Sequence, residues 1–184
     1  MKTKFVKDLM VPLSEYATVA EDASLYDAVM ALKQSQADYD QTRYRHRAIL
    51  VLDANQQIVG KVTFHEILKA LEPKYEDMLS DSGPWHMGFT RKYQKAIFES
   101  LKLWQDPLDQ VCQKAGKIKV NVFMMAPKEN EMIETDSALS EAIHQLVIGH
   151  HQSLLVTQGK RIVGVLRLTD AFEYVSNAIL ACKK

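Results

Sequence analysis

Histidine is the side chain most often used for proton transfer and metal binding, and the chain has six of them, at positions 46, 65, 86, 144, 150 and 151. His144, His150 and His151 are close in sequence, but a spacing of i, i+6 and i+7 does not place three ligands on one helical face. No cysteine or carboxylate ligand pattern surrounds them. We therefore predict no metal site and interpret these histidines as polar loop residues.

Other signatures of catalysis are also missing from the sequence. There is no Gly-x-Ser-x-Gly elbow, no glycine-rich loop that would cradle a phosphate, and no His-Glu-x-x-His pair. Cys112 and Cys182 stand 70 residues apart without Cys-x-x-Cys spacing, which is typical of reduced thiols. These observations predict a protein that is not an enzyme and that has no catalytic residues.

The densest basic cluster is Arg43-Tyr44-Arg45-His46-Arg47. It could contact RNA or the phosphates of a small ligand, and the alternative is a solvated loop. The whole chain has 23 basic and 23 acidic residues, so it has no general attraction for nucleic acid. No apolar run approaches the ~18 residues that span a bilayer, and the first residues lack the apolar segment of a signal peptide. We expect a cytoplasmic protein that binds neither nucleic acid nor membrane.

The sequence contains an internal repeat. Residues 18–34 (TVAEDASLYDAVMALKQ) align with residues 132–148 (MIETDSALSEAIHQLVI) at an offset of 114, and the same offset pairs Met10 with Met124. Residues 48–68 parallel residues 153–172 at an offset of about 104–105, which indicates an insertion of about nine residues around positions 38–47 of the first copy. Two matches in the same order predict two copies of one supersecondary unit.

Each copy has the pattern of a helix, two strands and a second helix, and a further short strand can precede the first helix. In the first copy, apolar residues at helical spacing follow Ser24, whose capping-box partner Asp27 comes three residues later. The pattern then predicts a buried strand over 48–52, a turn over 53–57, a strand over 58–63 and a helix over 64–71 that ends near Pro73. In the second copy it predicts a helix over 138–148, strands over 153–157 and 161–166, and a helix from Thr169.

One such copy would bury too little surface to be stable alone. We therefore predict an α/β (α+β) fold in which two β-α-β-β-α repeats pack sheet to sheet about a pseudo-two-fold axis, which creates two equivalent clefts. The expected boundaries are 1–72 for the first repeat, 73–118 for an intervening segment and 119–184 for the second repeat.

The intervening segment is predicted to be a helical insertion. We expect a loop at 80–84 and a helix over 90–104 whose apolar stripe is Tyr93, Ile97, Leu101 and Trp104. A second helix is expected to be capped by Asp106, with Pro107 at its first position, an apolar stripe of Leu108, Val111, Cys112 and Ala115, and an end at Gly116.

The order of segments within each copy is similar to a known family. Each copy opens with an apolar segment that ends in methionine, at 6–10 and 120–124, continues through an aspartate into an apolar helix, and closes with a buried strand, a turn and Val-Gly. This order resembles the CBS domain, named after cystathionine β-synthase, over about residues 5–72 and 119–180. The resemblance implies a tandem CBS-domain (Bateman) module that is a regulatory homodimer and binds adenine nucleotides or related ligands between its repeats.

The resemblance also implies which residues bind the ligand. After the glycine, the family has two residues, a Ser or Thr that binds phosphate, two more residues, and an Asp that accepts hydrogen bonds from ribose. The first copy has Thr63 and Glu66 at these positions, and the second has Arg167 and Asp170. Arg167 can pair with a phosphate, and Asp170, next to Thr169, stands at a helix start that favours an anion, so we rank this site first. The alternative is that Thr169 and Asp170 only cap the last helix.

By the same resemblance, an adenine ring would contact the segments before the first helix of each copy, about 17–19 and 132–134, with Val19 and Ile133 as site residues. The alternative is that both belong to ordinary core strands. The implied ligands are AMP, ADP, ATP or S-adenosylmethionine, and no cofactor is assigned. We expect a module that binds an adenosyl ligand and signals to a partner protein. The alternative is a ligand-independent interaction scaffold that acts through the insertion.

Overall fold

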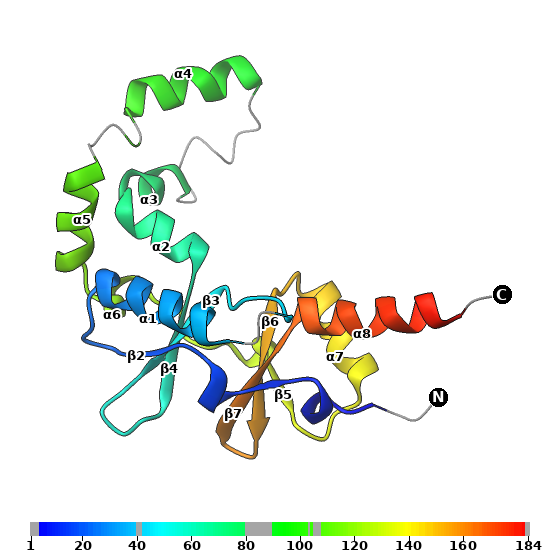
Figure 1. Cartoon of the computed structure of the whole chain (residues 1–184). Coiled ribbons are helices and arrows are strands. Elements are labelled where there is room, and N and C mark those ends of the chain that lie inside the picture. Colours follow the sequence, from blue (N-terminus) through cyan, green and yellow to red (C-terminus); the bar gives the residue numbers. More distant parts are fainter. Residues whose placement is uncertain (1–3, 40–41, 80–89, 103, 105–107, 183–184) are drawn as a thin grey trace.

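The computed structural model describes residues 4–39, 42–79, 90–102, 104 and 108–182. Two sheets form the centre of the molecule (Figure 1). The first consists of β2 (Thr18–Ala20), β3 (Ala48–Leu52) and β4 (Ile58–Thr63) and carries α1 (Leu25–Asp38) and α2 (Phe64–Leu71). The second contains β5 (Met132–Glu134), β6 (Ser153–Gln158) and β7 (Arg161–Arg167) and carries α7 (Leu139–Ile148) and α8 (Leu168–Ala181). The predicted pair of α/β repeats is confirmed.

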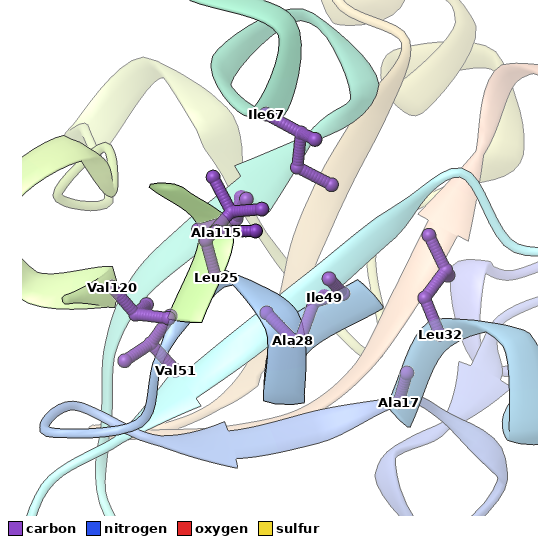
Figure 2. Close-up of a cluster of buried hydrophobic side chains, with 10 residues drawn as sticks. Ala17, Leu25, Ala28, Leu32, Ile49, Val51, Ile67, Ala115 and Val120 are labelled. Atoms are coloured by element: carbon purple, nitrogen blue, oxygen red, sulfur yellow. The ribbon is translucent and has the colours of Figure 1, made fainter. Parts of the chain in front are cut away.

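The apolar strands are buried on both faces because each strand contributes to two cores. In β3, Ile49 and Val51 pack toward the helices of their own repeat (Figure 2), whereas Leu50 belongs to a cluster that also contains Leu155 and Val165 of the other sheet. Successive side chains of a strand point to opposite faces, so a continuous apolar run serves a helix layer and a sheet-to-sheet layer at once. The predicted packing of sheet against sheet follows from this alternation.

The two repeats exchange their opening segments. Val6 is fully buried in the core of the second repeat, and Val120 is fully buried in the core of the first. The backbone N–H of Val6 donates to the Ser137 carbonyl, and that of Val120 donates to the Ala23 carbonyl. The exchange also adds strand β1 (Val11–Pro12), which pairs antiparallel with β7 and makes the second sheet four-stranded. The segments involved are the 3-10 helix Val6–Asp8 and helix α6 (Val120–Phe123).

The glycine of each Val-Gly pair accommodates this exchange. A Cβ on Gly60 would lie 2.4 Å from the Sδ of Met124, and a Cβ on Gly164 would lie 2.7 Å from the Val11 carbonyl oxygen and 2.9 Å from the Sδ of Met10. The methionine that ends each opening segment therefore crosses directly over the glycine of the other repeat. This contact explains why both residue types recur in both copies.

The first repeat is longer than the second in two places. Helix α1 has 14 residues and α7 has 10, and the connection to the next strand covers 39–47 in the first repeat but only 149–152 in the second. The predicted insertion of about nine residues is thus divided between a longer helix and a longer connection. Two further 3-10 helices, Leu13–Glu15 and Glu129–Glu131, precede β2 and β5.

The intervening segment is helical, with differences from the prediction. It contains α3 (Lys74–Leu79), which we did not predict, α4 (Arg91–Leu101) and α5 (Leu108–Lys117). Trp104 lies beyond the end of α4, because Lys102 adopts a left-handed conformation that terminates the helix, so placing Trp104 in the stripe was wrong. Gly116 lies inside α5, one residue before its end.

Two parts of the same prediction lie outside the described residues, namely the 80–84 loop and the Asp106–Pro107 cap. Figure 1 shows α4 standing away from both sheets, whereas α5 returns to the first repeat, where Ala115 joins the core (Figure 2). Among the described helices, none is both long enough and apolar enough to cross a membrane.

Candidate functional site

A buried ion pair, Arg167 and Asp170, stands at the start of α8. Arg167 Nε and Nη2 donate to Asp170 Oδ2 and Oδ1, each at 2.5 Å, in a bidentate pair. Both side chains are buried, at 5% and 8% relative exposure. Burial disfavours the charged guanidinium, but the hydrogen bonds and charge of Asp170 outweigh it and raise the pKa of Arg167.

Arg167 also joins the two repeats. Its Nη1 donates to the Tyr44 carbonyl at 2.5 Å and lies 3.4 Å from His46 Nδ1, and its Nη2 lies 3.4 Å from the Tyr39 hydroxyl. Tyr39, Tyr44 and His46 all belong to the first repeat. The guanidinium therefore fixes the long 39–47 connection of the first repeat against the first turn of α8.

His46 is completely buried beside this pair, so the alternative of a solvated loop does not hold for this residue of the basic cluster. Its ring lies between Tyr16 and Tyr39, with centroids 4.5 and 4.1 Å away. Burial, helped by the charge of Arg167, lowers the pKa of His46 to about 4, so the ring is neutral at pH 7. Burial also raises the pKa of Tyr16 to about 12.

Asp170 faces a cavity of about 450 Å³, which we call the Asp170 cavity. Three segments form it: the exchanged opening segment of the first repeat, the 39–47 connection, and one face of α8. Arg43 contributes a cation, with its Nη2 3.8 Å from Asp170 Oδ1. The lining residues are Asp8, Leu9, Met10, Thr42, Arg43, Tyr44, Asp170, Glu173, Tyr174 and Asn177.

The equivalent position in the other repeat holds a second cavity of about 600 Å³, which we call the Glu66 cavity. Glu66, Lys69, Ala70 and Pro73 of this cavity each stand 104 positions before a residue that lines the Asp170 cavity. Val122, Phe123 and Met124 of the opening segment α6 likewise stand 114 positions after Asp8, Leu9 and Met10. The two clefts predicted from the pseudo-two-fold repeat thus exist as cavities, and each combines an exchanged segment with the second helix of a repeat.

The carboxylate of Glu66 is engaged within its own helix. Its Oε2 accepts hydrogen bonds from the backbone N–H of Thr63 at 3.0 Å and from the Thr63 hydroxyl, and its Oε1 lies 3.1 Å from His65 Nδ1. Thr63 in turn caps α2 by accepting from the His65 N–H. Burial would raise the pKa of Glu66, but these hydrogen bonds more than offset it and lower the pKa. Thr63 and Glu66 form a capping box.

A third, smaller cavity of about 210 Å³ lies between the starts of α2 and α8, and we call it the central cavity. It is formed almost equally by the two repeats, and three arginines line it. The lining residues are Tyr16, Arg45, Arg47, Ala48, Thr63, Phe64, Gln152, Ser153, Arg167 and Thr169.

The structure brings together most of the predicted site residues. Arg167 and Asp170 are paired, and Arg167, Thr169 and Thr63 share the central cavity. Val19 and Ile133 are apart from them: Ile133 is buried in the second core, and Val19 packs against the first. Neither lines any of the three cavities. A role of these residues in binding a ligand stays a prediction.

Two groups of residues that line the Asp170 cavity were not predicted as site residues from the sequence. Asp8 and Leu9 were recognised only as part of an opening segment, and Thr42 to Tyr44 only as part of a basic cluster. The i, i+3 spacing of Arg167 and Asp170 could have revealed their pairing. His144 lies on helix α7 rather than in a loop, and the described residues contain no group of three or more metal-ligating side chains.

Comparisons with known proteins identify a CBS domain in the first repeat and the fold of the whole chain. Residues 6–73 match the CBS domain family model. Solved structures of CBS proteins match the whole chain: a CBS domain-containing protein from Bacillus anthracis has a TM-score of 0.61, 16% identity, and coverage of 95% of this chain and 94% of that one. CBSX2 from Arabidopsis thaliana, a CBS-pair protein, has a TM-score of 0.61, 17% identity, and coverage of 97% and 99%.

A third structure is CBSX2 in complex with AMP, with a TM-score of 0.58, 19% identity, and coverage of 98% of this chain and 99% of that one. At these identities the structures establish the fold of the chain. No curated protein matches the sequence. The first repeat therefore matches the CBS domain model by its sequence, and the chain as a whole has the fold of CBS-pair proteins.

Proposed function

We propose that this chain is a regulatory CBS-pair module that binds an adenosyl ligand in the Asp170 cavity. The observation that carries the proposal is the composition of that cavity: residues 8–10 and 42–44 come from the first repeat and residues 170–177 from the second. A ligand in it contacts both repeats. If the repeats can pack in two arrangements, the ligand shifts the equilibrium between them only to the extent that it binds one arrangement more tightly than the other. A partner protein that binds one arrangement can then respond to the ligand.

The chemistry of the cavity suits a nucleoside. The two oxygens of the Asp170 carboxylate offer about four acceptor sites, and Arg167 occupies two of them. The remaining sites are free to accept from ribose hydroxyls, while Arg167 holds the carboxylate in one orientation. Leu9, Met10 and Tyr174 supply apolar surface for a base. A structure of the same fold in complex with AMP, CBSX2, supports the ligand class.

The charges around the cavity favour ligands with few phosphates. Asp8, Asp170 and Glu173 line the cavity together with Arg43, so carboxylates outnumber cations in the lining. Like charges in a partly buried site disfavour a triphosphate. We expect S-adenosylmethionine or AMP to bind more tightly than ATP.

Thermal melting and calorimetry with AMP, ADP, ATP and S-adenosylmethionine test the proposal. A ligand at 100 times its Kd stabilises the native state by about 2.7 kcal/mol, so an upward shift of Tm is expected. Asp170→Asn, which keeps the shape of the side chain, should weaken binding at least tenfold. Lys69→Gln in the Glu66 cavity is the matched control. The absence of any shift at millimolar ligand, or equal affinity of the two variants, contradicts the proposal.

We also propose that the module is a homodimer. Helices α7 and α8 present exposed apolar side chains that include Ile148, Phe172 and Ile179, at 72%, 61% and 66% relative exposure. A C2 dimer is the commonest way to cover such a face. Light scattering should give twice the chain mass, and Phe172→Asp should give the monomer mass. A monomeric wild-type protein at micromolar concentration contradicts this assignment.

The alternative function is a ligand-independent scaffold that acts through the insertion. It is favoured by the position of α4, which stands apart from the two sheets (Figure 1) and has exposed side chains at Lys92, Tyr93 and Lys95. A scaffold would retain its partner when Asp170→Asn abolishes the ligand response, and would lose it when the exposed residues of α4 are replaced by serine.

A further inference from the structure

Arg43 stands between two carboxylates that belong to different repeats. Its Nη1 lies 3.9 Å from Oε2 of Glu15, and its Nη2 lies 3.8 Å from Oδ1 of Asp170. Both distances exceed those of hydrogen bonds between charged groups, which are about 2.7–2.9 Å. Arg167, in contrast, holds the same Asp170 carboxylate at 2.5 Å through two nitrogens. Asp170 therefore has one firmly bound cation and one loosely held cation.

The surroundings of Arg43 leave room for its side chain to move. Arg43 lines the Asp170 cavity, and Glu15 lines another cavity of about 540 Å³, which we call the Glu15 cavity. Tyr39 also lines the Glu15 cavity, and its ring centroid lies 5.3 Å from the guanidinium carbon of Arg43. The Arg43 side chain is 37% exposed, so tight packing does not fix it. The guanidinium can therefore move toward Glu15 and keep the Tyr39 ring as a neighbour.

A ligand in the Asp170 cavity has to compete with Arg43 for the same carboxylate. A hydroxyl group that donates to Oδ1 of Asp170 would place its oxygen about 2.8 Å from that atom. The Arg43 guanidinium, 3.8 Å from the same atom, occupies part of this space on the side of the cavity. A neutral ligand gives no charge in return for the attraction that is lost when the guanidinium moves away. The Glu15 carboxylate compensates for part of that loss.

This competition is a feature of the longer connection in the first repeat. Arg43 belongs to the 39–47 connection, and the corresponding connection of the second repeat covers only 149–152. Among the described residues that line the Glu66 cavity, none comes from 149–152. Glu15 does have a counterpart, since Glu129 follows it by the same 114 positions that relate the two opening segments. The second repeat thus supplies a natural control for Glu15.

We propose that Arg43 sets the ligand affinity of the Asp170 cavity by competing with ligand hydroxyl groups for the Asp170 carboxylate. Glu15 is then a positioning residue that draws Arg43 away from Asp170. The inference rests on the proposed function, because it concerns how the same cavity takes its ligand. It requires opposite effects of two substitutions: loss of Arg43 strengthens the binding of a neutral ligand, and loss of the Glu15 charge weakens it.

Isothermal titration with adenosine, which has no charge, tests the proposal. Arg43→Gln should bind about threefold more tightly than the wild type and Glu15→Gln about threefold more weakly, since a partly exposed ion pair contributes little. Glu15→Gln/Arg43→Gln should bind like Arg43→Gln, because Glu15 acts only through Arg43. The matched controls are Glu129→Gln and Arg161→Gln, which alter exposed residues of the second repeat and should bind like the wild type. Melting curves without ligand verify that the variants are folded.

The result that overturns the role of Arg43 differs from the result that overturns the proposed function. If Asp170→Asn weakens adenosine and Arg43→Gln does not strengthen it, only the role of Arg43 is overturned. The role of Glu15 is overturned if Glu15→Gln weakens binding equally with and without Arg43. If Asp170→Asn binds adenosine as the wild type does, or if neither the wild type nor Arg43→Gln binds it, both proposals are overturned.

Discussion

The Asp170 and Glu66 cavities occupy equivalent positions in the two repeats, yet they hold their carboxylates in different ways. Glu66 folds back onto Thr63 and closes a hydrogen-bonded cap within one helix. Asp170 pairs with Arg167, which also donates to the Tyr44 carbonyl of the other repeat. One substitution at the equivalent position, Arg for Thr, thus converts a local cap into a connection between repeats. Two repeats with the same fold can therefore differ in whether the carboxylate at the equivalent position is linked to the other repeat.

The largest predicted effect comes from removing one member of the buried pair. Asp170→Ala leaves the Arg167 guanidinium buried without its counter-charge, which should lower the free energy of unfolding by about 4 kcal/mol. Urea denaturation measures the change. The double variant Arg167→Met/Asp170→Ala removes both charges and should recover part of the loss. If the double variant is less stable than Asp170→Ala, the cost does not arise from the unpaired charge.

The next effect is a dependence of stability on pH that arises from His46, a residue of the first repeat. His46 has a pKa of about 4 when folded, and the ordinary value is 6.5, so between these values the unfolded chain binds a proton that the folded chain does not. Stability is complete above pH 6.5 and falls by about 3 kcal/mol as the pH drops to 4. Denaturation at several pH values should show a shallower slope in His46→Gln.

His151 occupies the equivalent position before β6, so His151→Gln is the matched control for this experiment. An unchanged slope in His46→Gln would show that other groups produce the dependence.

Much of the fold could be predicted from the sequence, because helix and strand periodicities depend on local spacing. The stripe after Ser24 and the apolar run at 48–52 each gave the correct element. The exchange of opening segments could not be predicted, since an apolar segment does not encode which of two similar cores receives it.

The candidate site was less predictable for a similar reason. Arginines flank His46, and such a segment is typical of a solvated loop. The burial of His46 depends on Tyr16, Tyr39 and Arg167, and these three residues come together only after the two sheets pack. Of the site residues expected from the family resemblance, Thr63 and Arg167 line the central cavity and Asp170 lines the Asp170 cavity. Ile133, in contrast, is part of the hydrophobic core.

The glycines of the two repeats should respond unequally to the same substitution. A Cβ on Gly164 meets the backbone carbonyl of Val11, which β1 pairing holds in place, whereas a Cβ on Gly60 meets the side chain of Met124. Gly164→Ala should cost about 3 kcal/mol and Gly60→Ala about 1 kcal/mol, because a methionine side chain can change rotamer. Thermal denaturation compares the two. Equal losses would show that Met124 is as constrained as the backbone.

The smallest effect is expected at the first-repeat cap. Glu66→Ala removes the capping-box partner of Thr63 and should cost about 1 kcal/mol, well below the loss for Asp170→Ala. The same denaturation curves report it. A loss as large as that of Asp170→Ala would mean that Glu66, too, supports the contact between repeats.

The exchange of opening segments has a consequence for biosynthesis. When the ribosome has released residues 1–72, the first core still awaits Val120, and the second core later has to recruit Val6 from the far end of the chain. Contacts between residues so far apart in sequence form late and slowly, because the chain loses the entropy of closing a long loop before the contact stabilises it. A nascent chain therefore reaches its stable state only when nearly all of it has emerged, and a truncated product exposes an unfilled core that quality-control proteases can recognise.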